Sequence, residues 1–189
     1  MSLFELAIRP LLLINGKKIN GYCKWFLKGK VLDVGAGRCY IAREIQDKND
    51  IDNIKVTCLD VKDLSQTGMK VVVYNGKKIP FKNNQFDAAL IAYVLHHCED
   101  ALSVLKEAVR VCKGNIVIFE DTKPSSFTKI MDFLSNRLRG VETPFKFRTE
   151  KEWIGVFKKL NLKIVAVKHD VEREWFYPFV QHTMVVARK

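Results

Sequence analysis

Long hydrophobic runs are absent from this chain of 189 residues. No stretch approaches the roughly 20 consecutive apolar residues that a membrane-spanning helix needs, so we expect no membrane span. The apolar segment Leu3 to Ile14 contains Glu5, Arg9 and Pro10, and it lacks a basic start and a small-residue cleavage site. We therefore do not expect a signal peptide. We expect a short amphipathic helix that opens with a Ser2-x-x-Glu5 capping box and is interrupted or ends near Pro10.

Paired cysteines are also lacking. The chain has five cysteines, which is an odd number, and no C-x-x-C sequence. Cys58 and Cys112 fall in apolar segments that are typical of a protein core. This usage argues against a disulfide framework and against a zinc site, and it is typical of a reducing cytosol. We therefore expect a cytoplasmic protein that has no bound metal.

Acidic residues are too few to balance the basic ones. The chain has 21 Asp and Glu against 32 Lys and Arg, which gives a formal net charge of +11. One interpretation is an anionic partner such as RNA, a phospholipid surface or an acidic metabolite. The other is a lysine-rich proteome, which we favour because base recognition and bidentate phosphate recognition use arginine. Nucleic acid stays a candidate partner.

The sequence does contain a regular alternation of predicted strands and helices. Several central strands are continuous apolar runs, which are typical of strands buried on both faces. The pattern predicts an α/β fold, a doubly wound, Rossmann-like, seven-stranded and mostly parallel sheet. No helix separates the last two strands, so the last strand is expected to be antiparallel. The predicted strands are 30–34, 54–60, 70–74, 86–92, 115–120, 163–168 and 183–187.

Helices are expected to connect most of these strands. The crossover at 61–69 is too short for more than a turn or two of helix. The second N-terminal helix is expected to carry Trp25 and Phe26 on its apolar side. A capping box of Thr149 and Glu152 opens the last helix. The predicted helices after the first are 17–28, 38–46, 100–112, 126–138 and 149–160.

The most informative stretch is Val31-Leu-Asp-Val-Gly-Ala-Gly37, in which a strand ends and a Gly-x-Gly turn opens a helix. Glycines let the backbone approach a ligand closely where a Cβ would clash. Asp33 would repel a dinucleotide pyrophosphate and attract a cation, and the sulfonium and ammonium groups of S-adenosylmethionine (SAM) have that sign. The alternative is that Asp33 only caps the following helix.

Other predicted strand ends also carry groups that could contact a ligand. Asp60 is placed to accept hydrogen bonds from both hydroxyls of a ribose. Asn75 with Gly76 could meet an adenine, and the segment 92–97 would lie over the methionine portion. Glu120 and Asp121 would face an acceptor. The alternatives are that Asp60 is an ordinary turn acid and that Asn75-Gly76 is a common turn dipeptide.

Taken together, these motifs resemble class I SAM-dependent methyltransferases. The resemblance rests on Asp33-Val-Gly-Ala-Gly37, on Asp60, and on Ile79-Pro-Phe-Lys-Asn-Asn-Gln-Phe-Asp87 followed by Tyr93-Val-Leu-His-His97. They are most similar to the group that includes the ubiquinone- and menaquinone-biosynthesis methyltransferases. The resemblance covers about residues 30–121. It is specific for the class I methyltransferase fold and for the cofactor, and it is weak for the substrate.

The resemblance implies SAM as cofactor and assigns its contacts by position. The glycine turn would pass beside the methionine and the ribose, and the second strand end would hold the ribose. The third strand end would meet the adenine, and the fourth would back the methionine. The residues expected to contact SAM are Asp33, Gly35, Ala36, Gly37, Asp60, Val61, Asn75, Gly76, Ala92 and Tyr93.

Two positions depart from the family pattern. Cys39 stands where a third glycine is usual, and its side chain could narrow the turn. Asn75 stands where an acid is frequent, and we expect it to accept a hydrogen bond through its carbonyl oxygen. These departures, with the short crossover at 61–69, leave room for a non-catalytic member of the family.

The reaction expected at such a site requires few catalytic side chains. Methyl transfer from a sulfonium is an in-line displacement that depends on positioning and desolvation. A general base is needed only when the nucleophile must lose a proton. The candidates by location are His96, His97, Glu120 and Asp121, and of these we assign His97, Glu120 and Asp121 as candidate catalytic residues.

The acceptor is expected to lie between the N-terminal helices and residues 122–148. This second segment contains aromatic residues and methionine, which suit an apolar or aromatic small molecule. These side chains could equally pack the segment onto the sheet. They are Phe127, Met131, Phe133, Phe145 and Phe147.

We predict a SAM-dependent methyltransferase with a small-molecule acceptor. The absence of an Asn/Asp-Pro-Pro-Tyr/Phe sequence and of a Pro-Cys nucleophile argues against methylation of adenine N6, glutamine or cytosine C5. One alternative is RNA or protein methylation, favoured if lysines 17, 18, 24, 28 and 30 cluster beside the cleft. A second is a non-catalytic SAM-binding or partner-binding module. An NAD-type oxidoreductase is disfavoured because Gly-x-Gly-x-x-Gly fails at Tyr40.

One domain is expected over residues 1–189, because we find no repeat, low-complexity tract or linker. We divide it by expected role into N-terminal helices at 1–29 and a cofactor-binding core at 30–121. An acceptor-side segment follows at 122–148, and a C-terminal helix with a strand hairpin follows at 149–189.

Overall fold

A seven-stranded mixed sheet organises the chain in the computed structural model, which describes residues 3–48, 53–123, 130, 133, 137, 146–171 and 181–189. The strand order is β3-β2-β1-β4-β5-β7-β6. β7 runs antiparallel to both β5 and β6, and the other pairs are parallel. The strands are β1 (Lys30–Val34), β2 (Lys55–Asp60), β3 (Val71–Val73), β4 (Phe86–Ala92), β5 (Cys112–Lys123), β6 (Lys163–Lys168) and β7 (Gln181–Arg188).

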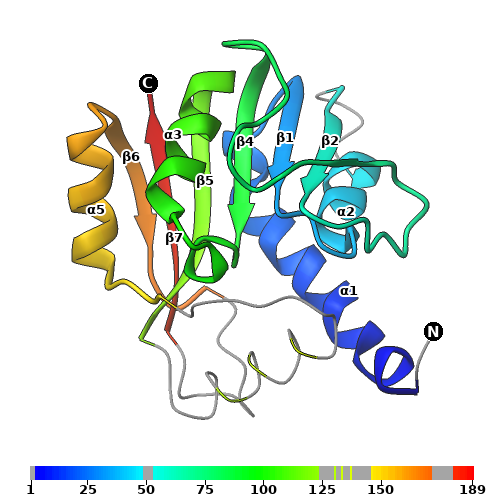
Figure 1. Ribbon diagram of the computed structural model, residues 1–189. Coiled ribbons are helices and arrows are strands. Elements are labelled where there is room, and N and C mark those ends of the chain that lie inside the picture. Colours follow the sequence, from blue (N-terminus) through cyan, green and yellow to red (C-terminus); the bar gives the residue numbers. More distant parts are fainter. Residues whose placement is uncertain are drawn as a thin grey trace.

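Helices cover both faces of this sheet (Figure 1). α1 and α2 pack on one face, and α3 and α5 pack on the other. Two short 3-10 helices, η1 and η3, follow α1 and β4. The bounds are α1 (Leu3–Cys23), η1 (Lys24–Phe26), α2 (Tyr40–Lys48), η3 (Leu95–His97), α3 (Ala101–Val111) and α5 (Glu150–Lys159).

The core is divided between the two faces of the sheet. On β1, Leu32 and Val34 belong to the cluster under α3 and α5, whereas Val31 belongs to the cluster under α1. Successive residues of a strand point to opposite faces, so a strand buried on both sides must be apolar at every position. The continuous apolar runs of the central strands therefore follow from the layered packing.

The predicted fold is confirmed. β1, β4 and β6 have the predicted bounds, and the last strand pairs antiparallel with β6. β5 is longer than predicted and runs from Cys112 to Lys123. The capping box of α5 is confirmed, because the Thr149 hydroxyl accepts from the Glu152 N–H and the Glu152 carboxylate accepts from the Thr149 N–H at 2.7 Å. Ser2 and most of the predicted helix 126–138 lie outside the described residues.

The prediction of two N-terminal helices was wrong, because α1 is one helix that continues through Pro10. Proline inside a helix costs about 3 kcal/mol. Ile19 and Cys23 are fully buried against the sheet, and this packing outweighs the local preference. At Gly16 an added Cβ would lie 3.2 Å from the Tyr40 carbonyl oxygen, so α1 and α2 approach closely there.

Trp25 was also predicted wrongly, as a side chain on an apolar face. Its side chain is 81% exposed, whereas Phe26 packs against the core. The chain changes from α-helix to 3-10 helix after Cys23, which rotates the following side chains relative to a continuous α-helix. Among the described residues, no helix is both long and apolar enough to cross a bilayer.

The crossover between β2 and β3 contains no helix, although the sequence left room for a turn or two, and all its residues are described. Gln66 ties this crossover to α2. Its N–H donates to the Arg38 carbonyl at 3.2 Å, and its side-chain oxygen accepts from the Tyr40 hydroxyl at 3.2 Å. The loop therefore has a defined position although it lacks regular structure.

Candidate functional site

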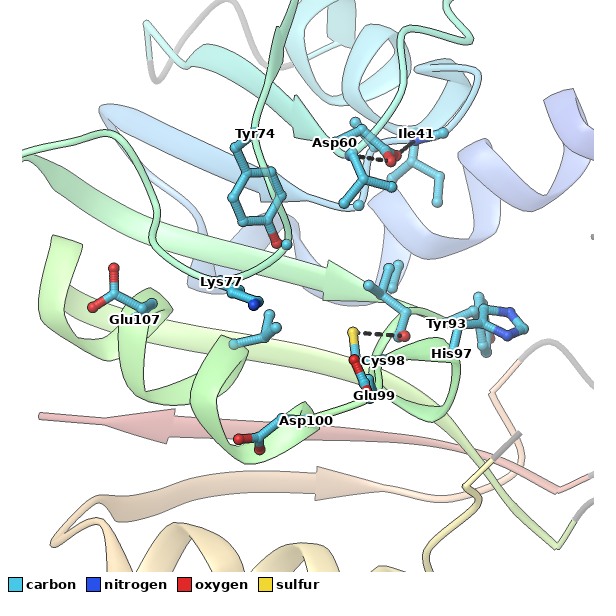
Figure 2. Close-up of a pocket in the computed structure, with 18 of the residues that line it drawn as sticks. Ile41, Asp60, Tyr74, Lys77, Tyr93, His97, Cys98, Glu99, Asp100 and Glu107 are labelled. Atoms are coloured by element: carbon cyan, nitrogen blue, oxygen red, sulfur yellow. Dashed lines mark hydrogen bonds between the residues drawn. The ribbon is translucent and has the colours of Figure 1, made fainter. Parts of the chain in front are cut away.

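A cavity of about 1000 Å³ lies at the carboxyl ends of β1, β2, β3 and β4. In a doubly wound sheet this edge is the usual place for a ligand. Figure 2 shows Asp60, Tyr74 and Tyr93, each from the end of a different strand, around it. Leu12, Ile19 and the loop before α3 complete the wall.

The Gly-x-Gly turn lines this cavity directly after β1. Gly35 and Gly37 have φ of +75° and +52°, which side chains rarely adopt. An added Cβ on Gly35 would also lie 2.4 Å from a methyl carbon of Val94. The Gly35 N–H donates to the Leu59 carbonyl at 2.7 Å, which fixes the turn on β2. The backbone of the Gly-x-Gly turn thus approaches the cavity closely, as the sequence predicted.

Asp60 joins the glycine turn to the end of β2. One carboxylate oxygen accepts from the Gly37 N–H at 2.7 Å, and the other accepts from the Val61 N–H at 2.7 Å. Each carboxylate oxygen can accept more than one hydrogen bond. Asp60 lies on the cavity wall, so its remaining lone pairs are available for a pair of ligand hydroxyls.

Asp33 lies outside the cavity lining, at the end of β1. Its side chain is 2% exposed, and its Oδ2 has no hydrogen-bond partner among the residues that the structure describes. Burial, together with the neighbouring Cys39 and Asp60, raises the pKa of Asp33 to about 8. A cation beside this carboxyl would favour its ionised form.

Cys39 has a positive φ of +63°, a conformation that glycine adopts more readily than other residues. Its side chain is buried and packs with Ala42 and Cys58. It does not line the cavity. The predicted narrowing of the turn therefore does not follow, because the thiol points into the core below the turn.

The loop after β3 supplies Asn75 and Gly76 to the cavity. The Asn75 side-chain oxygen accepts from the backbone N–H groups of Lys77 and Lys78 at 3.0 and 3.2 Å. This corrects the expectation that the Asn75 carbonyl serves as an acceptor for a ligand, because two backbone donors already occupy it. Gly76 has φ of +73° and lies against Val61.

The end of β4 brings Ala92, Tyr93 and His97 to the cavity. Tyr93 has φ of +58°, a strained conformation for a large side chain and one that is frequent at functional sites. Its N–H donates to the Phe119 carbonyl at 2.8 Å. Tyr93 and His97, both labelled in Figure 2, line the cavity beyond the carboxyl end of β4.

Glu120 does not line the cavity, and it is buried at the end of β5. Its Oε1 accepts from the N–H groups of Leu95 at 2.7 Å and Val94 at 3.2 Å. Its Oε2 lies 2.6 Å from Nδ1 of His96. One carboxylate therefore holds the start of η3, the segment that carries His97 into the cavity.

Asp121 is also buried outside the cavity lining, where it forms an ion pair with His182 of β7. The ring of His182 meets the ring of Tyr93 edge-on, with centroids 5.2 Å apart. Of the three candidate catalytic residues, His97 is the one that faces the cavity. Glu120 and Asp121 lie behind the residues that line it.

The acceptor-side segment is described only in part. Phe127, Met131 and Phe145 lie outside the described residues. Phe133 is 49% exposed, and Phe147 stacks on the His96 ring with centroids 4.7 Å apart. Phe147 is thus a packing residue behind η3.

Sequence reasoning missed the part of the cavity wall that helices and their flanking loops supply. Position after a strand end could have indicated Lys77 and Cys98. No local signal marks the α1 and α3 residues, because their role depends on how the helices pack. The missed residues include Leu12, Asn15, Ile19, Ile41, Lys77, Cys98, Glu99, Asp100, Ser103 and Glu107.

Comparisons with known proteins agree with this geometry. The family model described as a methyltransferase domain matches residues 32–119. An uncharacterised protein of Methanocaldococcus jannaschii is 28% identical over 164 residues, which cover 86% of this chain and 78% of that protein. The demethylmenaquinone methyltransferase of Bacillus licheniformis is 31% identical over 80 residues, 41% of this chain and 34% of that enzyme.

Solved structures share the whole fold. A SAM-dependent methyltransferase from Aquifex aeolicus aligns with a TM-score of 0.67 at 20% identity, over 94% of this chain and 91% of its own. A second, from Methanosarcina mazei, aligns with a TM-score of 0.66 at 20% identity, over 88% of this chain and 95% of its own. Residues 32–119 thus match a methyltransferase domain, and the chain has the fold of these SAM-dependent methyltransferases.

Proposed function

We propose that this methyltransferase transfers the methyl group of SAM to a small-molecule acceptor held in the cavity. The observation that carries the proposal is the Asp60 carboxylate, which joins the glycine turn to β2 on the cavity wall. A buried carboxyl at the end of β1 adds a partner for a cationic ligand. Both features fit a ligand that has ribose hydroxyls and a positive charge.

The proposed cofactor contacts follow the strand ends. Asp60 accepts from the ribose hydroxyls, and Val61 and Gly76 flank the adenine. Ala92 and Tyr93 back the methionine portion. The Asp33 carboxyl is buried outside the cavity lining, below the Gly-x-Gly turn. From there it attracts the positively charged end of SAM. Gly35, Ala36 and Gly37 provide the close backbone wall, and Asn75 completes the adenine side.

SAM supplies a methyl group on a sulfonium, which is a good leaving group. The protein then has to orient the acceptor in line with that methyl group and exclude water. His97 faces the cavity and is placed to take a proton from an acceptor that loses one. We assign Glu120 as a positioning residue, because it holds the backbone of η3 on which His97 lies.

A small molecule is the acceptor that the cavity supports best. Its volume of about 1000 Å³ suits two small ligands or one large one, since ligand pockets span roughly 300–1000 Å³. Leu12 and Ile19 of α1 give it an apolar wall opposite the strand ends. An apolar or aromatic acceptor would bury its surface there.

Calorimetric titration with SAM and S-adenosylhomocysteine, with NAD as a control ligand, tests the cofactor assignment. We expect Asp60→Ala to weaken SAM binding at least about tenfold, because hydrogen bonds to a charged group contribute about 1.5–3 kcal/mol each. Asp63→Ala is the matched control, because this exposed acid lies in the same loop. Circular dichroism confirms that each variant is folded. An unchanged dissociation constant for Asp60→Ala contradicts the ribose assignment.

Labelled SAM tests the acceptor class. The purified protein is incubated with methyl-labelled SAM and with separate small-molecule, RNA and protein fractions of its source cells. We expect label in the small-molecule fraction. Label in RNA or protein would contradict the small-molecule proposal, and SAM binding without any transfer would favour a non-catalytic module.

A further inference from the structure

We propose that one face of α1 and η1 docks on an anionic phospholipid surface. This docking face consists of Leu13, Ile14 and Lys17 of α1, Trp25 of η1 and Lys28, which follows η1, and all five side chains are exposed. The inference depends on surface chemistry alone and is independent of the proposed acceptor.

The docking face exposes three large apolar side chains. Trp25 is 81% exposed, and Leu13 and Ile14 are 43% and 46% exposed. Leu13 and Ile14 lie in α1, and Trp25 lies in η1, which follows α1 directly. Tryptophan and aliphatic side chains beside lysines are typical of helices that lie in a membrane interface.

The charge of this region complements an anionic surface. Between Pro10 and Leu32 the chain has five lysines and no Asp or Glu. The Lys24 ammonium lies 4.9 Å from the centre of the Trp25 ring, so cationic and apolar groups are interleaved. On the packed side, an added Cβ at Gly16 would lie 3.7 Å from Cβ of Glu44 in α2. That acid lies on the side of α1 that faces α2, so the exposed side stays positive.

Lipid fits this face better than nucleic acid does. Nucleic-acid contacts favour arginine for phosphates and bases, and the cations here are lysines. The exposed aliphatic side chains of Leu13 and Ile14 match acyl chains and have no hydrogen-bonding group to offer a phosphate backbone. Figure 1 shows that the N-terminal part of α1 extends beyond the sheet, where a flat surface can reach it.

The docking face also adjoins the cavity. Leu12, Asn15 and Ile19 of the same helix line the cavity wall. Docking through α1 would therefore bring the cavity close to the lipid surface. An apolar molecule dissolved in the bilayer would have a short path to the site.

Vesicle sedimentation of the full chain tests the docking. The probes are large vesicles of phosphatidylcholine, with or without phosphatidylglycerol. We expect binding to the anionic vesicles, weakened by salt, with a blue shift of tryptophan emission that Trp25→Ala removes. Lys17→Glu/Lys28→Glu should lower partitioning at least about tenfold, because each lysine near an anionic surface contributes about 1 kcal/mol.

A control with the same charge change separates local docking from net charge. Lys151→Glu/Lys158→Glu alters two exposed lysines of α5, on the other face of the sheet. We expect it to retain most of the vesicle binding. Equal losses in both double variants would overturn the proposal, as would an absence of binding to anionic vesicles. Binding of polyuridylate through the same lysines, without vesicle binding, would assign the face to RNA instead.

Discussion

Asp33 is a buried acid whose pKa lies far above that of a free aspartate side chain. Burial in the sheet raises its pKa to about 8, from a model-compound value of 3.8. One of its oxygens has no hydrogen-bond partner among the described residues. An acid that is neutral at pH 7 avoids most of the cost of a buried charge. When this carboxyl ionises, it places a negative charge below the glycine turn.

This predicts a pH dependence of stability. The folded state holds a proton on Asp33 that the unfolded chain releases above about pH 4. The free energy of unfolding should therefore fall as pH rises from about 4 to about 8, by at most about 1.4 kcal/mol per pH unit from this group. Asp33→Asn should reduce that slope and unfold at a higher denaturant concentration than the parent at pH 8. The exposed Asp63→Asn is the control, and identical slopes in all three proteins would contradict the assignment.

Two residues near the cavity have a positive φ although they are not glycine. Cys39 follows the glycine turn, and Tyr93 follows β4. Residues in sparsely populated conformations cost on the order of 1–3 kcal/mol each and persist where the surrounding structure dictates them. Buried packing with Ala42 and Cys58 holds Cys39. The hydrogen bond from the Tyr93 N–H to the Phe119 carbonyl holds Tyr93.

At the scale of elements, short segments at the strand ends are held by side chains from other elements. η3 is held by Glu120 of β5. The loop after β3 is held by α3, where Glu107 accepts from the Ile79 N–H at 2.9 Å and Arg110 donates to the Ile79 carbonyl at 2.9 Å. These contacts replace the regular secondary structure that the short loops lack.

The variant Glu120→Gln tests whether the Glu120 carboxylate keeps η3 in position. The amide offers one acceptor oxygen in place of a charged carboxylate that serves two N–H groups and a histidine. We expect a loss of about 1–3 kcal/mol in the free energy of unfolding, measured with denaturant. The amide proton of Leu95 should move upfield in the NMR spectrum as its hydrogen bond weakens.

The exposed Asp63→Asn, in the loop that follows β2 and outside the cavity lining, is the control and should leave the free energy of unfolding unchanged. Methyl transfer should also slow in Glu120→Gln, with SAM affinity nearly unchanged, if Glu120 acts by positioning His97. A stability equal to that of the parent would show that the carboxylate is not needed to hold η3.

At the scale of the whole molecule, the cavity joins parts of the chain that are distant in sequence. Residues from α1, from four strand ends and from α3 meet around it. A ligand that bridges them should therefore stabilise the folded state as a unit. The sheet order, with β1 and β4 adjacent at its centre, creates this meeting point.

Thermal unfolding with SAM checks that coupling. At a SAM concentration about 100 times its dissociation constant, the expected stabilisation is about 2.7 kcal/mol. For a chain of this size the midpoint should rise by about 5–10 °C. NAD at the same concentration should leave the midpoint unchanged. A rise with NAD that equals the rise with SAM would contradict recognition of the cofactor by this site.

The sequence by itself determined the features that depend on local pattern. The bounds of β1, β4 and β6, the capping box of α5 and the Gly-x-Gly turn follow from periodicity and from residue types that only certain backbones accept. Asp60 could be placed at the cavity because the ends of parallel strands share one edge of a sheet.

Tertiary structure alone decided which polar groups face the cavity. Glu120 was predicted to end its strand as Asp60 ends β2, yet it lies within β5 and its carboxylate accepts from the backbone of η3, 25 residues earlier in the chain. Packing of Ile19 and Cys23 carries α1 through Pro10, and a 3-10 turn leaves Trp25 exposed. These outcomes depend on partners that are distant in sequence and meet only in the folded chain, so no local pattern could indicate them.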